Sequence, residues 1–238
     1  MMYKTKETNP DGTRCRLFVD MDGTLAEWRN IKFSVDSIES TKTLSNEVIQ
    51  KRLNNILYSP DYFKTLKPNR NVLEAVRSLI YESNIDVYIL SCVLPDKGNI
   101  SPLAQKNDWL NQYLPEIKQN HRIFVPCGQD KRQYVPNRVQ KTDFLLDDYT
   151  QNLVSWDKEG KAIKLLNGVN ASKGTWTGKR VSYNVPPSEL KNDLLAIVYK
   201  DKEVRHYPPE RNTEYIEDKN FLTYQELSQE SDEIEFGV

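Results

Sequence analysis

The sequence contains few cysteines, no long apolar segment and no excess of charge of either sign. Its three cysteines are too few and odd in number for a disulfide framework, and none has a second cysteine at zinc-site spacing, so we expect reduced thiols. No run approaches the roughly 20 apolar residues of a membrane helix, and residues 1–7 lead into polar sequence instead of the apolar core of a signal peptide. We therefore expect a cytoplasmic protein without a membrane partner.

The net charge of −1 provides no excess of positive charge to bind the phosphates of a nucleic-acid backbone, which argues against long nucleic acids as partners. Two motifs of phosphate chemistry are also missing. Neither Cys92 nor Cys127 is followed by arginine at the spacing of a cysteine-dependent phosphatase loop, and residues 174–179 have too few residues between their glycines for a P-loop. The 238 residues allow one α/β domain, at about 100–200 residues per domain, together with an appendage.

An apolar run at residues 17–19 ends in two carboxylates, Asp20 and Asp22, that are one residue apart. Such a run is typical of a strand covered on both faces of a parallel sheet, and Gly23 can reverse the chain after it. The two carboxylates repel one another unless a cation or a proton intervenes, and a hard cation such as Mg²⁺ prefers oxygen ligands. A calcium loop of the EF-hand type is excluded, because Gly23 comes too early and Ile31 stands at the twelfth position.

The sequence that follows alternates short apolar runs with helical patterns. We expect strands at 86–90, 121–125, 142–146 and 162–166, and helices at 68–81, 101–115 and 149–154. This alternation predicts an α/β fold, a Rossmann-like open parallel sheet with helices on both faces. Residues 27–66 lack strand alternation and carry a helical apolar stripe, so they form a small helical insertion after the first strand.

The second half of the sequence contains a predicted domain boundary at Pro186 and Pro187. We therefore expect a domain of residues 1–186, which includes the insertion, and a C-terminal extension of residues 187–238. Within the extension, apolar alternation predicts a hairpin of strands 194–199 and 203–207.

Five polar residues fall at the carboxyl ends of predicted strands: Asp20, Asp22, Ser91, Asp147 and Asp148. Because the carboxyl ends of parallel strands meet at one edge of a sheet, where ligands bind, we expect these side chains to share a site. A purely structural role for the Asp147–Asp148 pair, the capping of the helix that follows, stays open.

The segment 20–25, Asp-Met-Asp-Gly-Thr-Leu, resembles the first signature motif of the haloacid-dehalogenase-like phosphohydrolases. The resemblance implies that Asp20 attacks phosphorus and forms an aspartyl-phosphate. It implies that Asp22 is the general acid and base, and that the backbone carbonyl of Asp22 is a Mg²⁺ ligand. It further implies that the insertion after the first strand is a cap over the active site.

The same resemblance extends to the later strand ends. It implies that Asp148 is a metal ligand, with Asp147 orienting it or sharing the role, and that the Ser91 hydroxyl binds the phosphoryl group. The family also needs a cation for the phosphoryl oxygens. Lys141 begins the strand that ends at Asp147 and so lies roughly 20 Å from the site, which makes Lys131 the preferred candidate.

Arg132 is the second candidate for the phosphate-binding cation. Residues 16–170 are similar more specifically to the 5'(3')-deoxyribonucleotidases, the cytosolic type C nucleotidases, in which matching aromatics enclose a nucleobase. Trp28 and Phe63 would then be the base platform. The Ser91-Cys92 pair departs from the more usual Thr-Ser of that family.

We therefore expect a Mg²⁺-dependent phosphatase of nucleoside 5'-monophosphates, deoxyribonucleotides in particular, that works through phospho-Asp20. One alternative keeps the chemistry but takes a small sugar phosphate or other metabolite as the substrate. An alternative of another class is a non-catalytic binding or regulatory protein on the same scaffold. The sequence leaves base preference, a homodimer and the role of residues 187–238 open.

Overall fold

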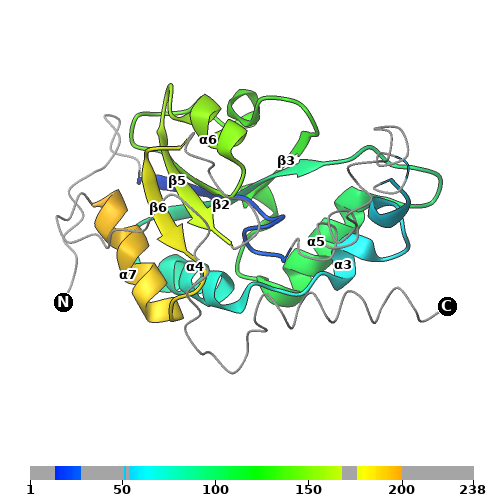
Figure 1. The fold of residues 1–238 in the computed structure, drawn as a ribbon, viewed down its shortest axis with the longest axis horizontal. Coiled ribbons are helices and arrows are strands. Elements are labelled where there is room, and N and C mark those ends of the chain that lie inside the picture. The colour runs from blue at the N-terminus through cyan, green and yellow to red at the C-terminus, as the bar shows by residue number, and fades with distance from the viewer. Residues whose placement is uncertain (1–13, 28–50, 52–53, 168–175, 200–238) are drawn as a thin grey trace, which may run out of the picture.

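The computed structural model describes residues 14–27, 51, 54–167 and 176–199. Within these ranges the chain forms a six-stranded sheet in the order β3-β2-β1-β4-β5-β6, and each adjacent pair of strands is parallel (Figure 1). The strands are β1 (Arg16–Val19), β2 (Asp86–Val93), β3 (Arg122–Pro126), β4 (Phe144–Asp147), β5 (Lys161–Leu166) and β6 (Lys179–Ser182). The predicted open parallel sheet is confirmed, and β6 is an addition to the predicted strands.

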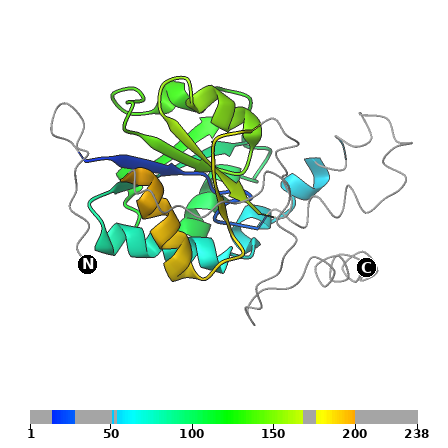
Figure 2. The same cartoon turned by 60° about the vertical axis from the view of Figure 1, so that its left-hand side comes forward.

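Helices cover both faces of the sheet. They are α3 (Tyr62–Thr65), α4 (Arg70–Glu82), α5 (Pro102–Tyr113), α6 (Thr150–Trp156) and α7 (Pro187–Val198), with short 3-10 helices η2 (Gln119–His121) and η3 (Lys131–Tyr134). Figures 1 and 2 show α4 and α7 on one face and α6 on the other. None of these helices has the combination of length and hydropathy that crossing a bilayer requires.

The alternation of side chains along β1 divides the core between the two faces. Leu17 and Val19 belong to the larger apolar cluster, which includes buried residues of α4, α5 and α7. Phe18 belongs to the smaller cluster and packs against Trp156 of α6, with ring centroids 5.2 Å apart. All three side chains are fully buried, as the uninterrupted apolar run predicted.

The strand order reverses at β1, which pairs with β2 on one side and with β4 on the other. The backbone N–H of Asp20 extends the β1–β4 ladder by donating to Leu146 O at 2.9 Å. In open α/β sheets the connections diverge at such a reversal and leave a crevice at the carboxyl ends of the strands. The fold therefore brings the residues after β1 next to those at the end of β4.

Several local predictions need correction. The strand β2 continues through Ser91 and Cys92 to Val93, although we expected it to end before Ser91. The helix α4 begins at Arg70 and not at the predicted residue 68, and the side chain of Asn71 in its first turn donates to Tyr183 O at 3.1 Å.

Two apolar side chains on the helices α5 and α6, Leu103 and Val154, are exposed. Leu103 is 41% exposed because the buried positions in the first part of α5 belong to Gln105 and Lys106. Val154 is 47% exposed because Leu153 and Trp156 form the buried side of the short helix α6.

The predicted strand 194–199 is wrong, since these residues lie in and just after the helix α7. This helix begins after Pro186, packs against α4, and buries Leu190, Leu194 and Ile197 in the larger apolar cluster. A short apolar run does not distinguish a strand from a buried helix by its pattern alone. The second predicted strand, 203–207, lies outside the described residues.

Only part of the insertion at 27–66 can be described. Residues 54–57 are helical, as the apolar stripe predicted, and α3 packs against α5. Two hydrogen bonds join the end of the insertion to α5: the indole of Trp109 donates to Leu66 O at 2.7 Å, and Phe63 N donates to Gln105 Oε1 at 2.9 Å. Trp28 lies outside the described residues, and the role of the insertion as a cap remains a prediction.

Candidate active site

The turn after β1 brings two of the predicted acids to the edge of the sheet. Backbone hydrogen bonds close the turn: Gly23 N donates to Ala26 O and Ala26 N donates to Met21 O, both at 2.8 Å. Gly23 has φ of +79°, a conformation that favours glycine. A Cβ atom on Gly23 would lie 2.3 Å from Asp148 Oδ2, so the absence of a side chain allows the turn to approach Asp148.

Three buried carboxylates meet in this crevice. Asp20, Asp147 and Asp148 each offer an oxygen, and these oxygens lie within 4.8 Å of one another. Asp148 is therefore within metal-bridging reach of Asp20, as the proposed chemistry requires. Burial raises the pKa of Asp147, the ammonium of Lys131 opposes this rise, and the charge of Asp20 adds to it.

Asp147 and Asp148 have different surroundings. Asp147 Oδ1 accepts from Tyr149 N at 2.7 Å, while Oδ2 accepts from Asn152 Nδ2 at 2.9 Å and from Lys131 Nζ at 2.7 Å. Asp147 thus contacts the start of α6 and the lysine, although the N-cap residue of this helix is Tyr149 and not an aspartate. Its carboxylate is engaged on both oxygens.

Asp148 is held by residues that sequence reasoning missed. Asn167, directly after β5, donates from Nδ2 to Asp148 Oδ2 at 2.8 Å and to Gly23 O at 2.7 Å. Lys164 on β5 donates to Asp148 O and to Thr150 Oγ1. The only sequence signal for Asn167 was its position after an apolar strand, at the same edge as the acids. Asn167 ties the two acidic loops together.

Lys131 lies between the acids of β1 and β4. Its Nζ is 2.7 Å from Asp20 Oδ1 and 2.7 Å from Asp147 Oδ2, and the side chain is buried. Burial alone would lower the pKa of Lys131, but the carboxylates of Asp147 and Asp20 outweigh burial and raise it. Lys131 is therefore a fixed ammonium at the centre of the cluster.

The two other predicted cations lie elsewhere. Arg132 pairs with Asp130 at 2.6 Å and with Glu159 at 2.5 Å, and Lys141 is exposed in the turn before β4. Neither contact involves the buried acids. Of the three candidates, Lys131 is the one that the structure places between Asp20 and Asp147, and its phosphate-binding role stays a prediction.

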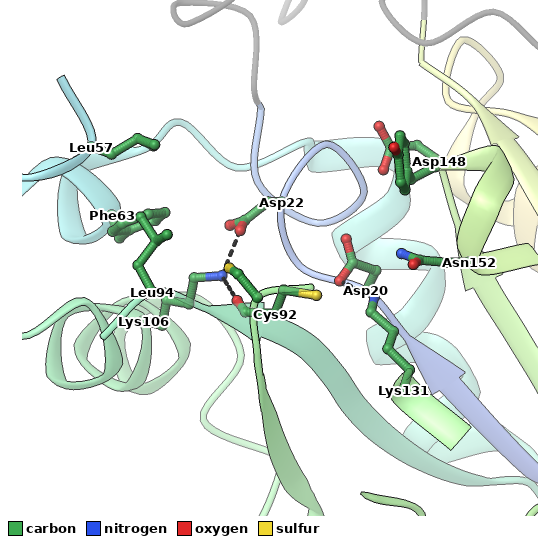
Figure 3. Close-up of a pocket in the computed structure, with 12 residues that line it drawn as sticks. Asp20, Asp22, Leu57, Phe63, Cys92, Leu94, Lys106, Lys131, Asp148 and Asn152 are labelled. Carbon is green, nitrogen blue, oxygen red and sulfur yellow. Dashed lines mark hydrogen bonds and ion pairs between the residues drawn. The ribbon is translucent and has the colours of Figure 1, made fainter. Parts of the chain in front are cut away.

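A second buried lysine, Lys106 on α5, was not predicted. Its Nζ lies 2.5 Å from Asp22 Oδ2, 3.2 Å from Ser91 Oγ and 2.5 Å from Cys92 O (Figure 3). The available signal was its spacing, since Lys106 precedes the buried Trp109 and Leu110 by three and four residues and so shares their helix face. Lys106 joins the second acid of the turn to the predicted phosphoryl donor.

Asp22 differs from the other acids in its neighbours. Its carboxylate is directed to Lys106 and is not part of the three-carboxylate cluster; the predicted metal contact of Asp22 concerned its backbone carbonyl and stays a prediction. Burial raises the pKa of Asp22, although Lys106 pulls it down, and the charge of Asp20 raises it further. Asp22 Oδ1 is buried and accepts no hydrogen bond from any side chain or backbone group in the described ranges.

These residues line a cavity of about 370 Å³. Figure 3 shows its two ends, with Asp20 and Asp148 at one and Leu57, Phe63 and Leu94 at the other. Phe63 is only 2% exposed, and Lys106 Nζ lies 5.0 Å from its ring centroid. The cavity therefore combines an ionic end with an apolar end, and a ligand can reach Phe63 through only a small part of its ring.

The donor set fits a hard divalent cation. The clustered ligand atoms are all carboxylate oxygens, and they lie close enough to coordinate one ion. Since both oxygens of Asp147 are engaged with protein donors, Asp20 and Asp148 are the carboxylates best placed to hold Mg²⁺. Three buried carboxylates repel one another, and Lys131 between Asp20 and Asp147 and Lys164 beside Asp148 offset only part of their charge.

The sheet is open and parallel, β1 runs into Asp-x-Asp, and β4 ends in paired acids beside a buried lysine. These features define a haloacid-dehalogenase-like hydrolase. Residues 14–174 match the model of the family described as "5' nucleotidase, deoxy (Pyrimidine), cytosolic type C protein". The match spans more than half of the sequence, and the chain belongs to this family. The protein is thus a phosphatase of the haloacid-dehalogenase type.

Solved structures with a similar overall fold include hydrolases from two bacteria. A hydrolase from Pseudomonas syringae has 16% identity and a TM-score of 0.48, and the alignment covers 77% of this chain and 99% of that one. A haloacid dehalogenase-like family hydrolase from Streptococcus pneumoniae has 11% identity and a TM-score of 0.49, with 77% and 98% covered. No curated protein sequence matched the chain. The family match, and not these likenesses, places the protein in its class.

We expect Gly23→Ala to lower phosphatase activity by roughly a hundredfold, because the new methyl group would displace the Asp148 carboxylate from the cluster. The positive φ adds a backbone cost of about 1–2 kcal/mol to the free energy of folding. Release of phosphate from a chromogenic aryl phosphate, measured alongside thermal unfolding, checks both effects.

Gly98→Ala is the matched control, because Gly98 also has a positive φ, of 60°, but a Cβ there would meet nothing within 4 Å. It should lose stability to a similar degree and keep its activity. Equal activities for the two variants would show that the approach of Gly23 to Asp148 has no role in catalysis.

Proposed function

We propose that the protein hydrolyses nucleoside 5'-monophosphates, deoxyribonucleotides in particular, as a Mg²⁺-dependent phosphatase that works through phospho-Asp20. The observation that carries this proposal is the convergence of Asp20, Asp147 and Asp148 within 4.8 Å of one another at the strand ends. The ion pair of Asp20 Oδ1 with Lys131 supports it, because that contact orients the carboxylate and leaves Oδ2 outside the ion pair.

In the proposed reaction, a carboxylate oxygen of Asp20 attacks phosphorus and the ester P–O bond breaks. Asp22 gives its proton to the departing alkoxide oxygen, and the resulting carboxylate then removes a proton from the water that attacks phospho-Asp20. This second displacement releases inorganic phosphate and restores both acids. The buried Oδ1 of Asp22, which accepts no hydrogen bond within the described residues, and the raised pKa of Asp22 support its role as proton carrier.

The negative charge of the phosphoryl group is met by the two lysines that line the cavity. Lys131 supplies an ammonium beside Asp20, and Lys106 supplies one beside Asp22 and Ser91, whose hydroxyl is the proposed phosphoryl donor. Mg²⁺, when bound, would offset further charge on the phosphoryl oxygens. Asp20 and Asp148 would hold it together with the backbone carbonyl of Asp22, and Asp147 would orient these groups.

The apolar end of the cavity supports a nucleoside as the leaving group. Leu57, Phe63 and Leu94 offer an apolar surface on the far side of Lys106 from the acids, at the position that a base would take (Figure 3). The description of the family, a deoxy pyrimidine 5'-nucleotidase, supports the same class of substrate. Trp28, which follows the Asp20 turn in sequence, is proposed as the second aromatic contact.

A panel of phosphate esters, assayed with and without Mg²⁺, tests the proposal. We expect kcat/KM for deoxyribonucleoside monophosphates to exceed that for sugar phosphates by about tenfold or more, since a stacked base contributes about 1–3 kcal/mol. Phosphate release should stop in excess chelator and return when Mg²⁺ is added in excess.

The control variant is Trp28→Ala, which should lose the preference for nucleotides and keep turnover of sugar phosphates. Equal turnover of both ester classes, unchanged in Trp28→Ala, would favour a phosphatase of small metabolites. Failure of every ester to yield phosphate with Mg²⁺ would favour a non-catalytic binding protein.

A further inference from the structure

Two thiols lie side by side at the rim of the site, on adjacent strands. Cys92 pairs in register with Val125, and Cys127 N donates to Val93 O at 3.1 Å, which continues the β2–β3 ladder one residue beyond β3. Because side chains alternate along strands, Cys92 and Cys127 are diagonal neighbours on one face of the sheet. Both residues line the cavity of the acids.

The two sulfurs differ in environment. Cys127 is exposed, whereas Cys92 is half-buried. The neighbouring Cys92 thiol lowers the pKa of Cys127 to about 7, and Lys106 assists, whereas partial burial and the charges of Asp22 and Asp20 oppose this change. The neighbouring Cys127 thiol and burial raise the pKa of Cys92. Cys127 is therefore the more nucleophilic thiol, and Cys92 is the neighbour that can reach it.

We propose that Cys92 and Cys127 form a modification site for hydroperoxides, and that the resulting disulfide reversibly lowers phosphatase activity. The Cys127 thiolate attacks the peroxide O–O bond; the sulfur is oxidised by two electrons to a sulfenic acid, and the peroxide is reduced to an alcohol, or to water if it is hydrogen peroxide, once the leaving oxygen takes a proton. The Cys92 thiol then attacks the Cys127 sulfur. The S–S bond forms, the S–O bond breaks, and the oxygen leaves as water with the proton from Cys92.

The link to activity rests on the proposed function and on the backbone that carries the two thiols. Cys92 O accepts from Lys106 Nζ at 2.5 Å (Figure 3). Ser91 precedes Cys92 in β2. Lys131 follows Cys127 by four residues, through the Gly128 turn. A disulfide requires its two Cα atoms to lie within about 7 Å. Formation of the bond between these diagonal neighbours would therefore shift the end of β2 and the turn after β3, and with them the contacts of Lys106 and Lys131. Displacement of catalytic groups by about 1 Å can cost a hundredfold in rate.

The experiment treats the full-length reduced protein with hydrogen peroxide, maps disulfides by peptide mass spectrometry, and measures phosphate release before and after reduction by dithiothreitol. We expect a Cys92–Cys127 linkage, at least a tenfold loss of activity, and recovery of both thiols and activity on reduction. The peptide map does not depend on phosphatase activity, so it reports on the site even if the proposed function is wrong.

Each control variant is compared with its own reduced form. Cys127→Ser should form no linkage and lose no activity on oxidation. Cys15→Ser should behave as the wild type, because Cys15 is buried and its Sγ donates to Thr142 O at 2.9 Å. The proposal is overturned if peroxide yields no Cys92–Cys127 linkage, if the linkage leaves activity unchanged, or if Cys127→Ser loses activity as the wild type does.

Discussion

Asp20→Asn should reduce phosphate release by roughly a thousandfold or more, while the protein remains folded. An amide is a very weak nucleophile toward phosphorus, so the covalent step is lost. Folding should persist because an asparagine oxygen can still accept the hydrogen bond that Lys131 makes with Asp20 at 2.7 Å. The loss of one negative charge also relieves Asp22 and Asp147, whose pKa values the charge of Asp20 raises.

The measurement is single-turnover phosphate release with Mg²⁺, together with a search for acid-stable or trapped phosphoprotein by mass spectrometry. Asp108→Asn is the matched control, because it removes the same charge from an exposed ion pair, in which Asp108 lies 3.2 Å from Lys64. Retention of more than a tenth of the wild-type rate in Asp20→Asn would rule out Asp20 as the nucleophile.

Lys131→Met should destabilise the protein by about 3 kcal/mol or more and remove most of its activity. The substitution leaves Asp20 and Asp147 as buried carboxylates without their shared ammonium, and an uncompensated buried charge is strongly destabilising. Denaturant unfolding gives the free energy of unfolding, and kcat/KM for the best ester gives the effect on activity.

Arg132→Met is the control for the loss of one positive charge at a neighbouring position. Arg132 pairs with the partly exposed Asp130 and Glu159, so its loss should cost about 1 kcal/mol or less. Equal stability losses in the two variants would contradict the central position of Lys131 among the acids.

Alkaline pH offers an independent reading of the same ion pairs. The pKa of Lys131 is raised above its ordinary value of 10.5, so its contribution to stability is complete below about pH 10.5 and is lost as the pH rises through the folded-state pKa. Above about pH 10.5, the free energy of unfolding of the wild type should therefore fall more steeply with pH than that of Lys131→Met.

The sheet could be predicted because its strands carry a strong local signal. Runs such as residues 17–19 are apolar without interruption, which is typical of a strand buried on both faces. The acids at the ends of these runs then follow from topology, since parallel strands bring their carboxyl ends to one edge. This reasoning was sufficient for the predicted proximity of Asp20, Asp147 and Asp148.

The second lysine could not be predicted with the same reasoning. Lys106 is a single charged residue in a helix, far from the acids in sequence, and its partners Asp22 and Ser91 are contributed by other elements. Whether a lysine on an apolar helix face is buried depends on which groups the fold places opposite it. Asn167 was missed for the same reason, because its contact with Asp148 is set by the end of β5 and not by a motif.

The error at residues 194–199 has a different origin. Its apolar residues suit a strand and a buried helix equally well, and only packing against α4 decides between them. The earlier part of α7, with a proline at its start and Glu189 in its first turn, did contain helix signals.

The helix α7 extends the folding unit of this phosphatase beyond the matched region. The family match stops at residue 174, yet Leu190 and Leu194 complete the apolar layer that α4 presents on that side of the sheet. A polypeptide truncated to the matched region would keep every acid and lysine of the site, but the apolar side of α4 that packs against α7 would be exposed to water. The segment that contains the active-site residues is therefore shorter than the segment that is needed to bury the apolar core.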